Sequence, residues 1–271
     1  MLSIWLVLTI FLNFDPAEAR DCNCGKVPRL AEHFAYLNTV DVENRSPPGQ
    51  NSLTCLTVPF MATMRAVGTN KTLCSGLILS QKMVIFPFNC LVVQAKEVPW
   101  GKYEIQVGSH SKSGGSFHQV RSLQTATNLA VGHSSYYLGF TLSNPIEFDC
   151  VNTLPICLNA PSANASEFVV VGHSLKDAAM RDYKDSGLYT VGTMKSFPCP
   201  PNHKHSLCLY SDKIGLMDAD EGGPALVLEN GIFYVVGMAA GGHIMEYENQ
   251  FGRKGVVGYA HYEYLNYSYL N

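Results

Sequence analysis

From about residue 55 onward, short apolar runs alternate with groups of glycine, asparagine, serine and proline. Five of these runs are Leu77–Leu79, Met83–Phe86, Tyr103–Val107, Phe168–Val171 and Ile232–Val236. Short apolar runs bounded by turn residues are typical of β-strands, and many of them in succession predict a barrel or a sandwich. The pattern therefore predicts an all-β protein. At the tyrosine-rich end of the chain, Tyr259–Leu270, a short C-terminal helix is expected.

The amino-terminal part of the chain has a different pattern. An apolar stretch, Ile4–Leu12, is followed by Ala17-Glu18-Ala19, which fits the small-x-small rule for signal-peptide cleavage. Residues 1–19 are therefore interpreted as a signal peptide. Residues 20–54 are polar and contain the turn-forming run Arg45–Gly49, which indicates an arm or linker. Residues 55–271 form the predicted folded domain.

Charge and cysteine content narrow the function. The formal net charge of −3 gives no basic field for nucleic acid, and no membrane-spanning segment is expected. All nine cysteines lie beyond the signal segment, which favours disulfides in an oxidising compartment, with an odd thiol left over. Their spacing matches no metal-binding pattern, and no cofactor is expected. Glycosylation sequons begin at Asn70, Asn164 and Asn266.

Four segments, in order, resemble those of the trypsin-like serine protease family, most closely the secreted homologues of insects. They are Pro59–Met64, Cys74–Ser80 with Val84–Cys90, Tyr136–Leu142 with Asn144–Leu158, and Asp220–Val227. The last segment, DEGGPALV, is similar to the family's DSGGPLV block. The resemblance covers about residue 55 to the end of the chain. It implies two six-stranded antiparallel β-barrels with a cleft between them.

The residues needed for the family's catalysis are replaced. At the positions of the histidine base, the orienting aspartate and the serine nucleophile, the chain has Asn89, Tyr136 and Glu221. An amide cannot accept a proton near neutral pH, and a carboxylate lacks an attacking hydroxyl. The oxyanion-hole glycine is replaced by Ala219. The resemblance therefore implies a protease homologue without catalysis, in which the Asn89 amide is expected to donate a hydrogen bond to Glu221.

The resemblance also implies a set of disulfides. Cys74 would pair with Cys90, Cys199 with Cys208, and Cys24 with Cys157, the last bond tethering the arm to the body. Cys22, Cys55 and Cys150 have no counterpart in the family. We expect Cys55 to pair with Cys150, which leaves Cys22 as the odd thiol and a candidate for an intermolecular disulfide.

These expectations together predict a secreted protein that works by binding other proteins. It would act as a regulator or adaptor in an extracellular network, such as an immune protease cascade or the protein network of a reproductive fluid. One alternative is a ligand-binding or antimicrobial module, which the slight negative charge disfavours. Another is residual hydrolysis, in which Glu221 and a histidine such as His203, His205 or His243 act as an acid–base pair.

Overall fold

The structure is a computed structural model. It describes residues 22–32, 58–68, 72–88, 102–109, 114–127, 136–158, 165–172, 176–177, 190–199, 201, 206–211, 214–216, 220–248 and 254–264. Within these ranges the protein is built of β-strands, with one helical turn over residues 28–32 and little other helix. The predicted signal peptide lies outside the described residues. The all-β class expected from the apolar pattern is confirmed.

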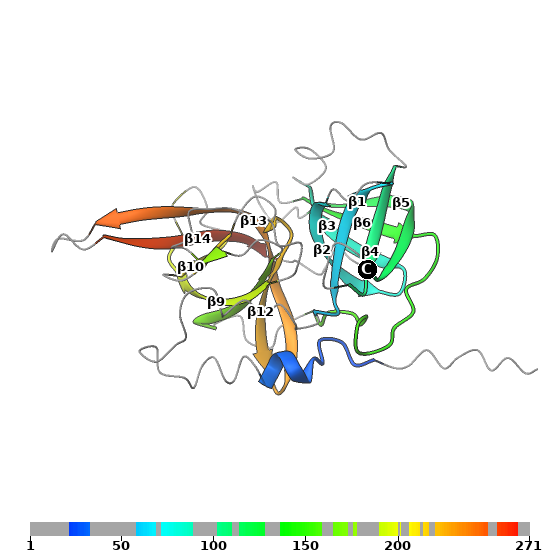
Figure 1. Cartoon of the computed structure of the whole chain (residues 1–271), viewed down its shortest axis with the longest axis horizontal. Coiled ribbons are helices and arrows are strands. Elements are labelled where there is room, and N and C mark those ends of the chain that lie inside the picture. The colour runs from blue at the N-terminus through cyan, green and yellow to red at the C-terminus, as the bar shows by residue number, and fades with distance from the viewer. Residues whose placement is uncertain are drawn as a thin grey trace, which may run out of the picture.

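Twelve of the strands close into two six-stranded antiparallel barrels, which lie side by side (Figure 1). The first barrel has the order β1-β2-β3-β6-β5-β4, with strands β1 (Met61–Ala66), β2 (Thr72–Ser80), β3 (Met83–Pro87), β4 (Tyr103–Val107), β5 (Ser116–Thr127) and β6 (Tyr136–Leu142). The second has the order β10-β14-β13-β12-β7-β9, with strands β7 (Glu167–Gly172), β9 (Thr190–Phe197), β10 (Leu207–Ser211), β12 (Pro224–Glu229), β13 (Ile232–Glu248) and β14 (Lys254–Tyr264). A small separate sheet pairs β8 (Lys176–Asp177) with β11 (Ile214–Gly215).

Each barrel encloses its own apolar core. In the first barrel, Phe86 of β3 and Phe140 of β6 pack edge to face, with ring centroids 5.5 Å apart. In the second, Phe168 and Tyr262 are buried with the aliphatic side chains of neighbouring strands. Inward-facing apolar residues from all six strands thus fill the interior of each barrel.

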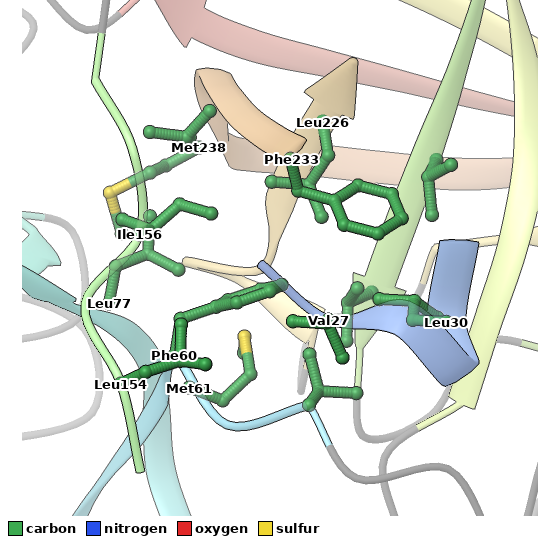
Figure 2. Close-up of a cluster of buried hydrophobic side chains, with 14 of the residues drawn as sticks. Val27, Leu30, Phe60, Met61, Leu77, Leu154, Ile156, Leu226, Phe233 and Met238 are labelled. Atoms are coloured by element: carbon green, nitrogen blue, oxygen red, sulfur yellow. The ribbon is translucent and has the colours of Figure 1, made fainter. Parts of the chain in front are cut away.

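A third apolar cluster joins the two barrels. It contains Phe60 and Leu77 from the first barrel and Leu226 and Phe233 from the second. Figure 2 shows these side chains facing one another, with Val27, which directly precedes the short amino-terminal helix, beside them. Phe60 and Phe233 are both completely buried. The interface is therefore a continuous core rather than a loose contact between two separate units.

The amino-terminal arm is part of this core. The Gly25 amide donates to the Pro155 carbonyl, and the Phe233 amide donates to the Gly25 carbonyl. Val27 and Leu30 of the arm are both buried in the joining cluster. Residues 22–32 belong to the predicted arm or linker, and their helix lies below β12 of the second barrel (Figure 1).

The expected C-terminal helix is wrong over the part of it that the structure describes. Tyr259–Tyr264 belongs to strand β14, which pairs with β13 on one side and with β10 on the other. Two alternate residues of β14, Ala260 and Tyr262, are both buried in the second barrel. The tyrosine-rich sequence shows no clear period of two, so the apolar pattern did not distinguish a strand from a helix here.

Candidate functional site

The segment that contains Glu221, which the sequence resemblance aligns with the family's serine, is a tight turn between the barrels. It comprises Asp220–Gly223 and leads into β12. The Ser75 amide of the first barrel donates to the Glu221 carbonyl at 3.1 Å, and the Gly222 amide donates to the Ala239 carbonyl of the second barrel at 2.9 Å. Backbone hydrogen bonds therefore fix the turn to both barrels.

Gly222 is required for this geometry. Its φ angle is +86°, a conformation that residues with a Cβ rarely adopt. A Cβ placed on Gly222 would overlap the carbonyl oxygen of Ser75. The glycine thus permits both the turn and the close approach of the first barrel.

Glu221 is held at the centre of the turn and is half-buried. Its Oε2 atom is removed from solvent. A carboxylate can accept hydrogen bonds or a proton, but it has no hydroxyl with which to attack a carbonyl. Asn89 lies outside the described residues, so the expected Asn89–Glu221 hydrogen bond stays a prediction.

The preceding residue, Asp220, is completely buried within the second barrel. Its carboxylate lies against Gly172 of β7, where a Cβ would overlap Oδ1. Burial raises the pKa of Tyr262 well above its usual value of 10, and the negative charge of Asp220 raises it further. The phenol is therefore neutral at physiological pH, and Asp220 shares an enclosed environment with it. The apolar pattern gave no indication of this pairing, because Tyr262 belongs to the segment expected to be a helix.

The remaining predicted site positions are described only in part. Tyr136 begins β6 and pairs with Thr127 of β5, but its side chain lies outside the description. His243 pairs with Tyr259 within the β13–β14 ribbon, again without a described side chain. Ala219, His203, His205 and the sequon residues Asn70, Asn164 and Asn266 all lie outside the described residues. The structure therefore places Glu221 and leaves its predicted neighbours as predictions.

Three disulfides are described. Cys24 bonds to Cys157 and Cys199 bonds to Cys208, the pairings that the resemblance implied. Cys22 bonds to Cys150, so the expected Cys55–Cys150 pair and the expected free thiol at Cys22 are both wrong. Sequence spacing could not reveal this bond, because residues 128 apart meet only once the arm has folded back on the body.

Cys74 is also disulfide-bonded, but its partner lies outside the described residues. The cysteines there are Cys55 and Cys90. The Cys74–Cys90 pairing therefore stays a prediction. Any odd thiol therefore belongs to Cys55 or Cys90 rather than to Cys22. The candidate for an intermolecular disulfide is then whichever of these two cysteines does not bond to Cys74.

A search against models of known protein families finds no match, and no curated protein sequence matches the chain. Among the described residues, no group of three or more histidine, cysteine, aspartate or glutamate side chains is arranged to hold a metal ion. In the same part of the chain, no helix has the length and apolarity needed to cross a membrane.

Proposed function

We propose that the chain is a secreted homologue of trypsin-like serine proteases that lacks catalysis and acts by binding other proteins. The observation that carries the proposal is the turn Asp220–Gly223. It lies between two closed six-stranded barrels. In the sequence resemblance, its Glu221 stands at the position of the family's serine. The backbone arrangement fits the family, whereas the side chain cannot perform the attack.

The second support comes from the disulfides. Two of them, Cys22–Cys150 and Cys24–Cys157, hold the arm against the body. Disulfides of this kind persist in oxidising compartments, which agrees with the signal peptide predicted for residues 1–19. A cross-linked scaffold with loops between its strands is suited to recognition in an extracellular fluid.

Loss of three catalytic groups would remove most of the rate. In a triad enzyme of another fold, loss of the whole triad lowers kcat by about 2 × 10⁶, or about 8–9 kcal/mol of barrier. Binding surfaces do not depend on those groups. The proposal therefore assigns the protein a role as regulator or adaptor in an extracellular proteolytic network.

The test combines capture and activity. The mature chain is immobilised and exposed to the secretion in which it is made, and the retained proteins are separated on reducing and non-reducing gels. We expect a stoichiometric protein partner, no cleavage of peptide substrates, and unchanged capture by the Glu221→Ala variant. Peptide cleavage that disappears in Glu221→Ala would refute loss of catalysis. Retention of a glycan or lipid in place of a protein would favour a ligand-binding module.

A further inference from the structure

A serine and a histidine are hydrogen-bonded to each other in the part of the first barrel that lies farthest from the second barrel and from the Glu221 turn. Both belong to β5, which lies on the side of the first barrel remote from the second (Figure 1). Ser116 Oγ is 2.9 Å from His118 Nε2. Because alternate residues of a strand point to the same face, an i, i+2 pair on one strand can meet in this way.

The histidine is oriented from its other side. His118 Nδ1 is 3.2 Å from the carbonyl oxygen of Asn144, which follows β6. A carbonyl oxygen only accepts hydrogen bonds, so Nδ1 carries the proton in this arrangement. In the neutral ring Nε2 is then the acceptor, and it faces the Ser116 hydroxyl. The result is a nucleophile, a base and a group that orients the base, in that order.

The two side chains differ in their exposure to solvent, in the way that a nucleophile and its base require. Ser116 is exposed, so an acyl donor can reach its oxygen. His118 is only 8% exposed, which holds the ring in one orientation and shields it from bulk water. Gly114 and Gly115, the two residues that precede Ser116, are exposed as well.

We propose that Ser116 is an activated nucleophile that accepts acyl groups from small activated carboxylic esters, with His118 as its general base. In this step Oγ bonds to the ester carbonyl carbon, and the bond from that carbon to the leaving aryl oxygen breaks. The Oγ proton passes to His118 Nε2 and from there to the leaving aryloxide. The product is an ester of Ser116, formed once per chain.

The inference is limited to formation of this ester. Rapid turnover also needs donors aimed at the developing oxyanion, and loss of one such donor costs about 10²–10³ in kcat. A strand does not present consecutive amides on one side in the way that a tight turn does. We therefore expect one equivalent of acyl group per chain and slow release.

The experiment incubates the full mature chain with p-nitrophenyl acetate and, separately, with an alkyl fluorophosphonate. Intact mass and peptide mapping then give the amount and position of the adduct. We expect one equivalent on Ser116, and none at that position in Ser116→Ala. Ser122→Ala, which changes another exposed serine of β5, should be labelled like the parent chain. Adducts spread evenly over several serines would overturn the inference.

His118→Asn separates a chemical role from a structural one. The asparagine amide can still donate to the Asn144 carbonyl, but it has no base to take the serine proton. Because general-base assistance contributes about 10²–10⁴ in rate, we expect labelling to slow by about 10²-fold or more. If thermal unfolding shows a folded variant that is labelled at the parent rate, His118 only ties β5 to the turn after β6, and the inference fails. Unchanged labelling of Glu221→Ala keeps this test separate from that of the proposed function.

Discussion

The turn at Glu221 and the pair on β5 contain complementary parts of one kind of chemistry. The turn has a backbone fixed by hydrogen bonds to both barrels, but its central side chain has no hydroxyl. The β5 pair has a hydroxyl and a base in contact, but it lies on a regular strand. The turn therefore has a backbone held by both barrels but no nucleophilic side chain. The strand has a nucleophilic side chain but no tight turn around it.

The contrast between the turn and the β5 pair shows which features hold the two barrels together. The hydrogen bonds of the turn and the close approach of Gly222 to Ser75 join the barrels, so they are needed whether or not catalysis occurs. Glu221 contributes its backbone carbonyl to these bonds, so we expect its side chain to be replaceable without loss of the fold. The β5 pair depends only on the first barrel and the turn after β6, so it should respond differently when the barrel interface is weakened.

The largest expected effect comes from removing both disulfides of the arm. Each bond closes a loop of well over one hundred residues, with separations of 128 and 133. The two bonds start from neighbouring cysteines, Cys22 and Cys24, and end at Cys150 and Cys157. While one bond remains, the other therefore closes only a short additional loop. We therefore expect replacement of either pair by serines to cost about 3 kcal/mol, and of both pairs about 7–8 kcal/mol. Urea unfolding of the single-pair and two-pair variants measures this.

A matched control for the arm is the Cys199–Cys208 pair, with a separation of 9. Its replacement should cost about 3 kcal/mol, similar to one arm bond removed alone. If the loss in unfolding free energy of the two-pair variant equals the sum of the two single-pair losses, the two arm bonds do not share one loop. Acylation of Ser116 should survive in the variant lacking the arm bonds wherever the first barrel stays folded, which sharpens the contrast between the two regions.

The next largest effect is expected from Gly222→Ala in the turn. The added Cβ meets the Ser75 carbonyl, and φ is +86°. We expect a loss of about 3 kcal/mol or more in the free energy of unfolding, because both strain and overlap must be relieved. Gly231→Ala is the control: its φ is +77°, but no atom lies within 4 Å of the added Cβ. That variant should lose only about 1 kcal/mol. Similar losses for the two would refute contact between the turn and the first barrel as the cause.

Some of these features could be predicted from sequence, and others could not. The strands followed from local apolar runs such as Met83–Phe86, and the segment around Glu221 was singled out by its similarity to a family motif. The end of strand β14 was mistaken for a helix, because its tyrosine-rich sequence has no clear period of two. The Cys22–Cys150 bond and the contact of Ser116 with His118 and Asn144 depend on chain segments meeting in space. A Ser-x-His pair on a strand is the one local signal that could have indicated the latter.

A smaller, pH-dependent effect is expected at Asp149, beside the Cys150 attachment point. Burial raises the pKa of this carboxyl, but hydrogen bonds from the Val151 and Thr153 amides and from Asn152 outweigh burial, and the pKa falls to about 2. The ionised form is favoured in the folded state, so its stabilisation is present above the unfolded pKa of about 4 and is lost as pH falls through about 2.

Asp149→Asn should therefore lower the free energy of unfolding by about 1–2 kcal/mol at pH 7, a range that allows for partial solvent screening. The difference from the parent chain should shrink between about pH 4 and pH 2. Denaturation at a series of pH values measures it. A pH-independent difference would assign the effect to altered packing of the loop rather than to the carboxylate charge.

The smallest expected effect is the most direct test of the comparison. Glu221→Ser places a hydroxyl at the centre of the fixed turn, but the predicted base position remains Asn89, whose amide cannot take the serine proton. We expect the new serine to gain no fluorophosphonate adduct above that of Ser122, while Ser116 is labelled as before. Peptide mapping distinguishes the three serines in one sample. Rapid labelling at position 221 would mean that the turn already has a base within reach, and the division between geometry and nucleophile would then fail.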